Sequence, residues 1–177
     1  GAALGLYRAG SACPPPSGQG RTGATGSHGV IRQLTALPQF WLVLFALAGL
    51  GLGRLFPIGL SSEIRGAGLF LVVAGLSLML WAAVVMRRAR TTFIPGRHPD
   101  ALVTHGPFRF SRNPIYLGDM IVLAGLFAAL SAPAGLILLP GFAWLLQHRF
   151  IRREEAMIAA DFGAEFETYK ARVRRWF

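Results

Sequence analysis

Two short segments hold most of the side chains that could do chemistry, and each lies next to a long apolar run. The first covers residues 104–118 and is rich in hydrogen-bond donors, namely His105, Arg109, Arg112, Asn113 and Tyr116. The second is the carboxylate pair Glu154-Glu155, which follows an uncharged run. Guanidinium and amide donors suit an anionic group, whereas a carboxylate suits a cation. Together the two segments favour a site for a charged or zwitterionic ligand.

The carboxylate pair lies at the start of a predicted amphipathic helix, residues 150–174. Its apolar stripe consists of Ile151, Ile158, Phe162, Phe166, Tyr169 and Val173. At about 100° per residue, Glu155 falls on this stripe and Glu154 falls at its edge. A carboxylate beside hydrocarbon needs a cation or hydrogen-bond donors. Spacing alone leaves two arrangements open: local ion pairs with Arg149, Arg152 or Arg153, or contacts with the donor-rich segment 104–118.

The elements that must position these segments are membrane helices. The chain has 177 residues, is 53% hydrophobic and 15% charged, and has a mean hydropathy of +0.48. Residues 33–53 and 66–86 are two runs of 21 residues without a charge. Each run is long enough to cross about 30 Å of hydrocarbon as a helix. Buried helices of a soluble bundle seldom lack charge over such a length, so the sequence predicts an integral membrane protein.

A third uncharged run, the 28 residues 120–147, allows two topologies. It could be one steeply tilted helix, or a hairpin that turns at Ser131-Ala132-Pro133. The hairpin places both arginine-rich regions on one side of the membrane, as the positive-inside rule requires. We therefore predict an all-α polytopic membrane helix bundle with four transmembrane helices, a kink at Pro140-Gly141 and a C-terminal interfacial helix. The predicted spans are residues 36–56, 66–86, 114–130 and 132–149.

The net charge of +10 is distributed along the chain in a way that indicates lipid rather than nucleic acid. Arg54 and Arg65 are the basic residues between the first two spans, whereas arginines are dense after the second span and in the tail. This asymmetry predicts that both termini and the site lie on the cytoplasmic side, facing anionic membrane lipids. We predict no nucleic-acid partner and no obligate protein partner.

The N-terminal segment, residues 1–32, is rich in Gly, Pro, Ser and Ala and is predicted to be disordered or artefactual. Residues 33–177 then form a single domain. The single cysteine, Cys13, excludes an internal disulfide and a Cys-based zinc site. His28, His98 and His148 show no convergent ligand spacing, so no metal site is predicted.

The stretch GPFRFSRNPIYLG, the hairpin after it and REEAMIAADFGAEFETYKARVRRWF resemble the isoprenylcysteine carboxyl methyltransferase family and the related phospholipid methyltransferases. The resemblance covers roughly Leu102 to Phe177. The ordered motifs and their separation make it specific, although each motif alone would be weak. One position departs from the family pattern: Asn113 stands where the family usually has His, and Asn cannot carry a proton charge.

This resemblance implies an integral membrane enzyme that moves a methyl group from S-adenosyl-L-methionine to a lipophilic or small-molecule acceptor, which could be a carboxylate, an amine or a thiol. A zwitterionic amino-acid end would be held through its ammonium by Glu154 or Glu155 and through its carboxylate by side-chain donors. Arg112, Tyr116 and Glu155 are the predicted catalytic residues. The predicted cofactor-binding residues are His105, Gly106, Arg109, Asn113, Tyr116, Gly118, Glu154 and Glu155.

The sequence allows alternative roles for two residues and two alternative functions for the protein. His105 is either a general base or an ordinary loop histidine, and Asp119 either belongs to the site or pairs with Arg109 or Arg112. Two other functions also remain: a non-enzymatic small membrane protein, such as a transporter subunit or assembly factor, and a membrane reductase that uses NADPH.

Overall fold

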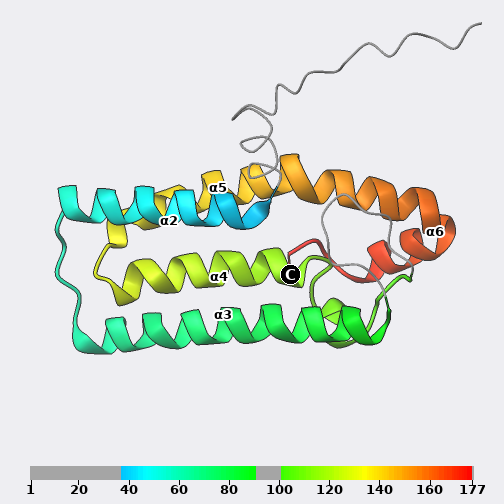
Figure 1. Ribbon diagram of the computed structural model, residues 1–177, viewed down its shortest axis with the longest axis horizontal. Coiled ribbons are helices and arrows are strands. Elements are labelled where there is room, and N and C mark those ends of the chain that lie inside the picture. The colour runs from blue at the N-terminus through cyan, green and yellow to red at the C-terminus, as the bar shows by residue number, and fades with distance from the viewer. Residues whose placement is uncertain (1–36, 91–100, 177) are drawn as a thin grey trace, which may run out of the picture.

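The computed structural model describes residues 37–90 and 101–176, and all regular elements within these ranges are helices (Figure 1). The elements are α2 (Pro38–Leu55), α3 (Ser62–Arg88), η1 (Gly106–Arg109), α4 (Pro114–Ala129), η2 (Pro133–Leu138), α5 (Leu139–Leu146), η3 (Gln147–Ile151) and α6 (Arg152–Arg172). The all-α prediction is confirmed for these residues. The N-terminal segment 1–32 lies outside the described residues, and its predicted disorder stays a prediction.

The helices form a layered bundle in which α4 lies between α3 and the layer of α2 and α5 (Figure 1). Close contact between α3 and α4 depends on facing glycines. A Cβ added to Gly118 would lie 2.3 Å from Met79 Cγ, and one added to Gly125 would lie 2.6 Å from the Gly68 carbonyl oxygen. Glycine at these positions therefore lets the two helices approach backbone to backbone, as small residues do in membrane bundles.

The chain doubles back between α4 and η2, so the predicted hairpin is confirmed and the single tilted helix is wrong. Helix α4 ends at Ala129, Ser131 adopts a positive φ of 53°, and the Ala132 amide donates to the Phe127 carbonyl over 2.8 Å. Pro133 then begins η2. The turn packs against α2, where a Cβ on Gly53 would lie 2.3 Å from the Ala132 Cβ.

Membrane helices account for the apolar surface of the bundle. Within the described residues, three helices are long and apolar enough to cross a membrane: α2, α3 and the continuous helix that begins at Pro133. In α2 and α3 only 17% of the most apolar window is buried within the protein, so lipid must cover the rest. Helix α4 is apolar but has 16 residues, about 24 Å at helical rise. The protein is an integral membrane protein. That α4 also crosses the membrane stays a prediction.

The fourth predicted span changes its helical type twice. Residues Pro133–Leu138 form a 3₁₀ helix, Leu139–Leu146 an α-helix and Gln147–Ile151 a π-helical turn. Pro140 lies in the first turn of α5, directly after the 3₁₀ turns of η2. The kink predicted at Pro140-Gly141 stays a prediction, whereas the changes of helical type at residues 138–139 and 146–147 were not predicted from the sequence.

The tail helix is not the single straight amphipathic helix predicted for residues 150–174. Gly163 has φ 46° and ψ −118°, which breaks α6 into two parts. The second part returns toward the bundle, where Phe166 and Tyr169 are buried and the Tyr169 hydroxyl donates to the Phe108 carbonyl over 2.7 Å. The predicted apolar stripe is present, and its second half packs against the loop before α4.

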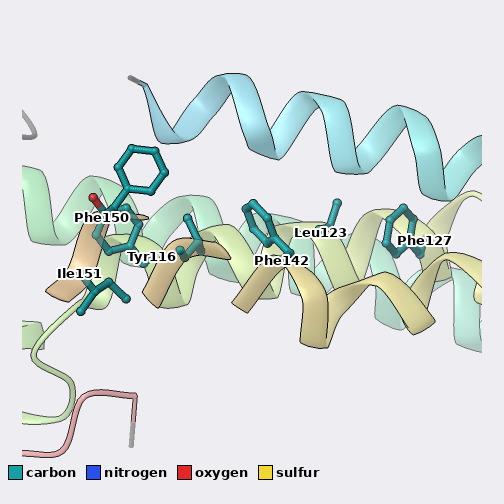
Figure 2. Packing of buried hydrophobic residues seen from close by; sticks show 7 residues of the cluster. Tyr116, Leu123, Phe127, Phe142, Phe150 and Ile151 are labelled. Carbon is teal, nitrogen blue, oxygen red and sulfur yellow. The ribbon is translucent and has the colours of Figure 1, made fainter. Parts of the chain in front are cut away.

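An apolar cluster holds α4 against α5 and η3. Figure 2 shows six of its residues labelled: Tyr116, Leu123, Phe127, Phe142, Phe150 and Ile151. The rings of Tyr116 and Phe150 lie 6.3 Å apart, centroid to centroid. Because this cluster reaches the start of α6, it fixes the position of Tyr116 relative to the Glu154-Glu155 pair.

Candidate active site

The polar segments meet at one end of the bundle. The loop before α4, the start of α4, helix α6 and the C-terminal residues gather there, while the α2–α3 connection and the α4–η2 turn lie at the other end (Figure 1). Arg54 and Arg65 belong to that other end. The predicted meeting of the two segments is confirmed. Which side of the membrane this end faces stays a prediction.

Glu155 is held by two arginines from distant parts of the chain. Arg112 Nη2 donates to Glu155 Oε1 over 3.1 Å, and Arg175 donates through Nε to the same oxygen over 3.2 Å and through Nη2 to Oε2. The side chains of Arg112 and Glu155 are 9% and 12% exposed, so the pair is largely shielded from solvent. The local alternative, in which Arg149, Arg152 or Arg153 neutralises Glu155, is wrong.

Glu154 has a different environment. The Tyr116 hydroxyl donates to Glu154 Oε1 over 2.7 Å, and the Tyr116 side chain is buried in the apolar cluster. Among the described residues, no Lys or Arg lies within ion-pair distance of Glu154. The two neighbouring carboxylates thus differ: Glu155 is neutralised by guanidinium groups, whereas Glu154 is bonded to a neutral hydroxyl.

The C-terminal residues bind the loop before α4 through their main chain. The Arg112 amide donates to the Arg174 carbonyl over 3.0 Å, and the Arg175 carbonyl accepts from Ser111 Oγ at 3.0 Å and from Asn113 Nδ2 at 3.4 Å. These bonds bring Arg175 to Glu155, twenty residues earlier in the chain. Arg175 is absent from the predicted site residues, because nothing in its type or spacing separates it from the other arginines of the tail.

The cluster carries a net positive charge. The hydrogen bonds from Arg175 to Glu155 raise the pKa of the Arg175 guanidinium above its usual value, so it is fully protonated. Two guanidinium groups and one carboxylate leave one positive charge in excess. A positive charge attracts an anionic group, and the Arg175 side chain that carries part of it is 28% exposed.

A groove of about 630 Å³ lies between the loop before α4 and the second part of α6. It is lined by Thr104, Arg109, Glu165, Thr168, Tyr169, Arg172 and Val173. Arg109 is therefore a groove residue and not a partner of Glu155. The predicted pocket between loop and tail helix has a counterpart here, although most of its lining residues come from the part of α6 beyond the unpredicted kink.

The other predicted residues have structural positions of their own. Exposed His105 precedes η1, and its carbonyl accepts from the Phe108 amide over 3.3 Å. Gly106 has a positive φ of 63° and lies against Val85. Gly118 is buried at the α3–α4 contact. Asp119 pairs with neither Arg109 nor Arg112: its side chain is fully buried, and neither carboxylate oxygen has a hydrogen-bond partner among residues 37–90 and 101–176.

The fold and these side chains define a class of protein, an integral membrane helix bundle with a cluster of charged residues at one end. Residues 64–165 match the phospholipid methyltransferase family model, and the chain belongs to that family. No solved structure matches the chain.

Curated relatives carry two kinds of name. The chain is 31% identical over 108 residues to a probable protein-S-isoprenylcysteine O-methyltransferase of Oryza sativa, a match that covers 60% of this chain and 56% of that one. It is 28% identical to protein-S-isoprenylcysteine O-methyltransferase A of Arabidopsis thaliana, over 67% of this chain and 62% of that one. It is 32% identical to the cobalt-zinc-cadmium resistance protein CzcN of Cupriavidus metallidurans, over 55% of this chain and 41% of that one. The chain spans about half the length of these relatives.

Proposed function

We propose that this protein is a membrane methyltransferase that moves a methyl group from S-adenosyl-L-methionine to a lipophilic or membrane-associated acceptor. The observation that carries the proposal is the pairing of two distant segments into one site: Arg112 with Glu155, and Tyr116 with Glu154. Membership of the phospholipid methyltransferase family supports the reaction type.

The residues present fit the amino-acid end of such a cofactor. A zwitterion needs a cationic partner for its carboxylate and an anionic partner for its ammonium. Arg112 offers the first, since its Nε is buried and has no hydrogen-bond partner in the part of the chain that the structure describes. Glu154 offers the second, because it has no guanidinium partner among the described residues. The groove with Arg109 and Tyr169 would take the nucleoside part.

S-adenosyl-L-methionine supplies a methyl group on a sulfonium. The protein's contribution is to bind, orient and shield the reacting groups. Tyr116 holds Glu154 in place through its hydroxyl, and the apolar cluster around its ring keeps water away from that side. A carboxylate or thiolate acceptor would need no base, whereas a protonated amine must first lose a proton. His105 is an exposed residue of the loop before α4, and it is the candidate base that would accept that proton.

The acceptor is proposed to be lipophilic because the site adjoins helices whose apolar faces are exposed to lipid. The relatives named protein-S-isoprenylcysteine O-methyltransferase support this, since that name describes an acceptor with a lipid chain. Carboxylate, amine and thiol acceptors all remain within the proposal.

The test is calorimetric titration of the purified protein in detergent with S-adenosylhomocysteine and, in parallel, with NADPH. We expect saturable binding of S-adenosylhomocysteine and none of NADPH at the same concentrations. Binding of NADPH alone would support a reductase and overturn the proposal. Binding of neither ligand would also contradict the proposal, because a methyltransferase of this kind must bind the cofactor product.

A further inference from the structure

The C-terminal residues of this protein make an unusually specific contact with the loop before α4. The carbonyl groups of Lys170, Arg174 and Arg175 all accept hydrogen bonds from residues 111–113. Main-chain acceptors at three positions fix the path of the tail independently of its side chains. The side chain of Arg175 is thereby left to point at Glu155.

Asn113 takes part in holding this tail. Its side-chain Nδ2 donates to the Arg175 carbonyl over 3.4 Å, and its main-chain N–H donates to Ser111 Oγ over 3.1 Å. Ser111 Oγ in turn donates to the same Arg175 carbonyl. The side-chain amide of Asn113 makes its bond to the Arg175 carbonyl without carrying a charge. Asn113 therefore acts on the site through the position of Arg175.

Arg175 differs from Arg112 in its access to a ligand. Its side chain is 28% exposed, against 9% for Arg112, and two of its nitrogens are already oriented by Glu155. A guanidinium whose fork is fixed by a carboxylate loses little conformational freedom when it binds a second anion. Its remaining nitrogen, Nη1, has no hydrogen bond within the described part of the chain.

We propose that Arg175 is a ligand-binding residue that, with Arg112, receives the carboxylate of an amino-acid zwitterion, while Glu154 rather than Glu155 receives the ammonium. Glu155 then orients the two arginines, and Asn113 positions the tail that carries Arg175. This inference rests on the proposed function, because it assigns the two ends of the cofactor within that site.

Two ligands separate this role from a structural one. S-adenosylhomocysteine has the zwitterionic end, whereas methylthioadenosine keeps the nucleoside and the thioether but lacks the amino-acid end. We expect Arg175→Gln to weaken S-adenosylhomocysteine binding by about 10-fold, the effect of one lost charge-assisted bond, and to leave methylthioadenosine binding unchanged. Arg175→Lys keeps the charge and should recover part of the affinity.

Arg174→Gln is the matched control, since it makes the same change in charge one residue away on an exposed side chain. It should bind both ligands as the wild type does. Equal losses for both ligands in Arg175→Gln, or an effect of the same size in Arg174→Gln, would overturn the inference. If Arg175→Gln does not purify as a monodisperse protein, Arg175→Lys and Asn113→Ala give the same comparison of ligands.

The proposed function and this inference can fail separately. A wild-type protein that does not bind S-adenosylhomocysteine contradicts the proposed function and, with it, this assignment. A wild-type protein that binds it, with unchanged affinity in Arg175→Gln, contradicts the assignment alone.

Discussion

The two ends of the bundle are built by different kinds of interaction. At the end with the α4–η2 turn, the contacts are apolar and close: Gly53 faces Ala132, and Gly68 faces the backbone of α4. At the end with the site, polar groups that are 20 to 64 residues apart are joined by hydrogen bonds and ion pairs. The structure of the first end depends on the close fit of small residues. The structure of the second end depends on hydrogen bonds and ion pairs between specific side chains. Substitutions at the two ends should therefore affect different properties.

The largest effect is expected at Glu155. Glu155→Gln leaves two shielded guanidinium groups without their carboxylate, which should destabilise the protein by about 3 kcal/mol and weaken S-adenosylhomocysteine binding. Thermal unfolding and calorimetry measure the two effects. Glu167→Gln is the control, because the Glu167–Lys170 pair is exposed and should contribute at most about 0.5 kcal/mol. Equal effects of the two substitutions would show that the Glu155 cluster has no special role.

A substitution at the α3–α4 contact should change stability without changing the ligand site. Gly125→Leu would force a side chain against the Gly68 carbonyl and should cost about 1–3 kcal/mol. Gly51→Ala is the control, since nothing lies within 4 Å of the added Cβ. Ligand affinity of the folded Gly125→Leu protein should equal that of the wild type. A large loss of affinity would mean that the two ends are coupled.

Tyr116→Phe tests the Glu154 side of the site. The substitution removes one hydroxyl and keeps the ring in the apolar cluster, so affinity for S-adenosylhomocysteine should fall by about 10-fold while the unfolding temperature changes little. Tyr169→Phe removes a hydroxyl of the same kind that binds the Phe108 carbonyl, and it should lower stability more than affinity. The reverse pattern would contradict the assignment of Glu154 to the ammonium of the ligand.

The smallest effect is expected at Asp119, a buried carboxyl with no hydrogen-bond partner. Asp119→Asn keeps the shape and removes the possibility of a charge, but it buries amide donors in place of the carboxyl group, so stability should change by less than about 1 kcal/mol and ligand binding should stay unchanged. The measurement is the unfolding temperature together with calorimetry. Lost ligand binding would show that Asp119 belongs to the site.

The sequence predicted the elements well because their signals are local. Uncharged runs of membrane length defined α2 and α3, and the distribution of arginines selected the hairpin at Pro133 over one long helix. The contact between Arg112 and Glu155 followed from that topology. Each of these predictions needed only composition, spacing and the preference of arginine for one side of a membrane.

What the sequence did not predict depends on contacts between distant residues. The Gly163 break could be read as an ordinary helical glycine, and its positive φ is stable because Tyr169 and Phe166 pack beyond it. Arg175 was one of several tail arginines, and its path is set by hydrogen bonds to residues 111–113. The preference of Glu155 for distant arginines over the adjacent Arg152 and Arg153 likewise follows from that path.

The most direct test of the central claim is a double-mutant cycle between Arg112 and Glu155, measured as affinity for S-adenosylhomocysteine. If the two residues build one site, Arg112→Gln and Glu155→Gln should each weaken binding, and the double variant should be little worse than either, with a coupling energy of about 1–3 kcal/mol. Fully additive losses, or unchanged affinity in both single variants, would contradict a ligand site formed where the loop meets α6.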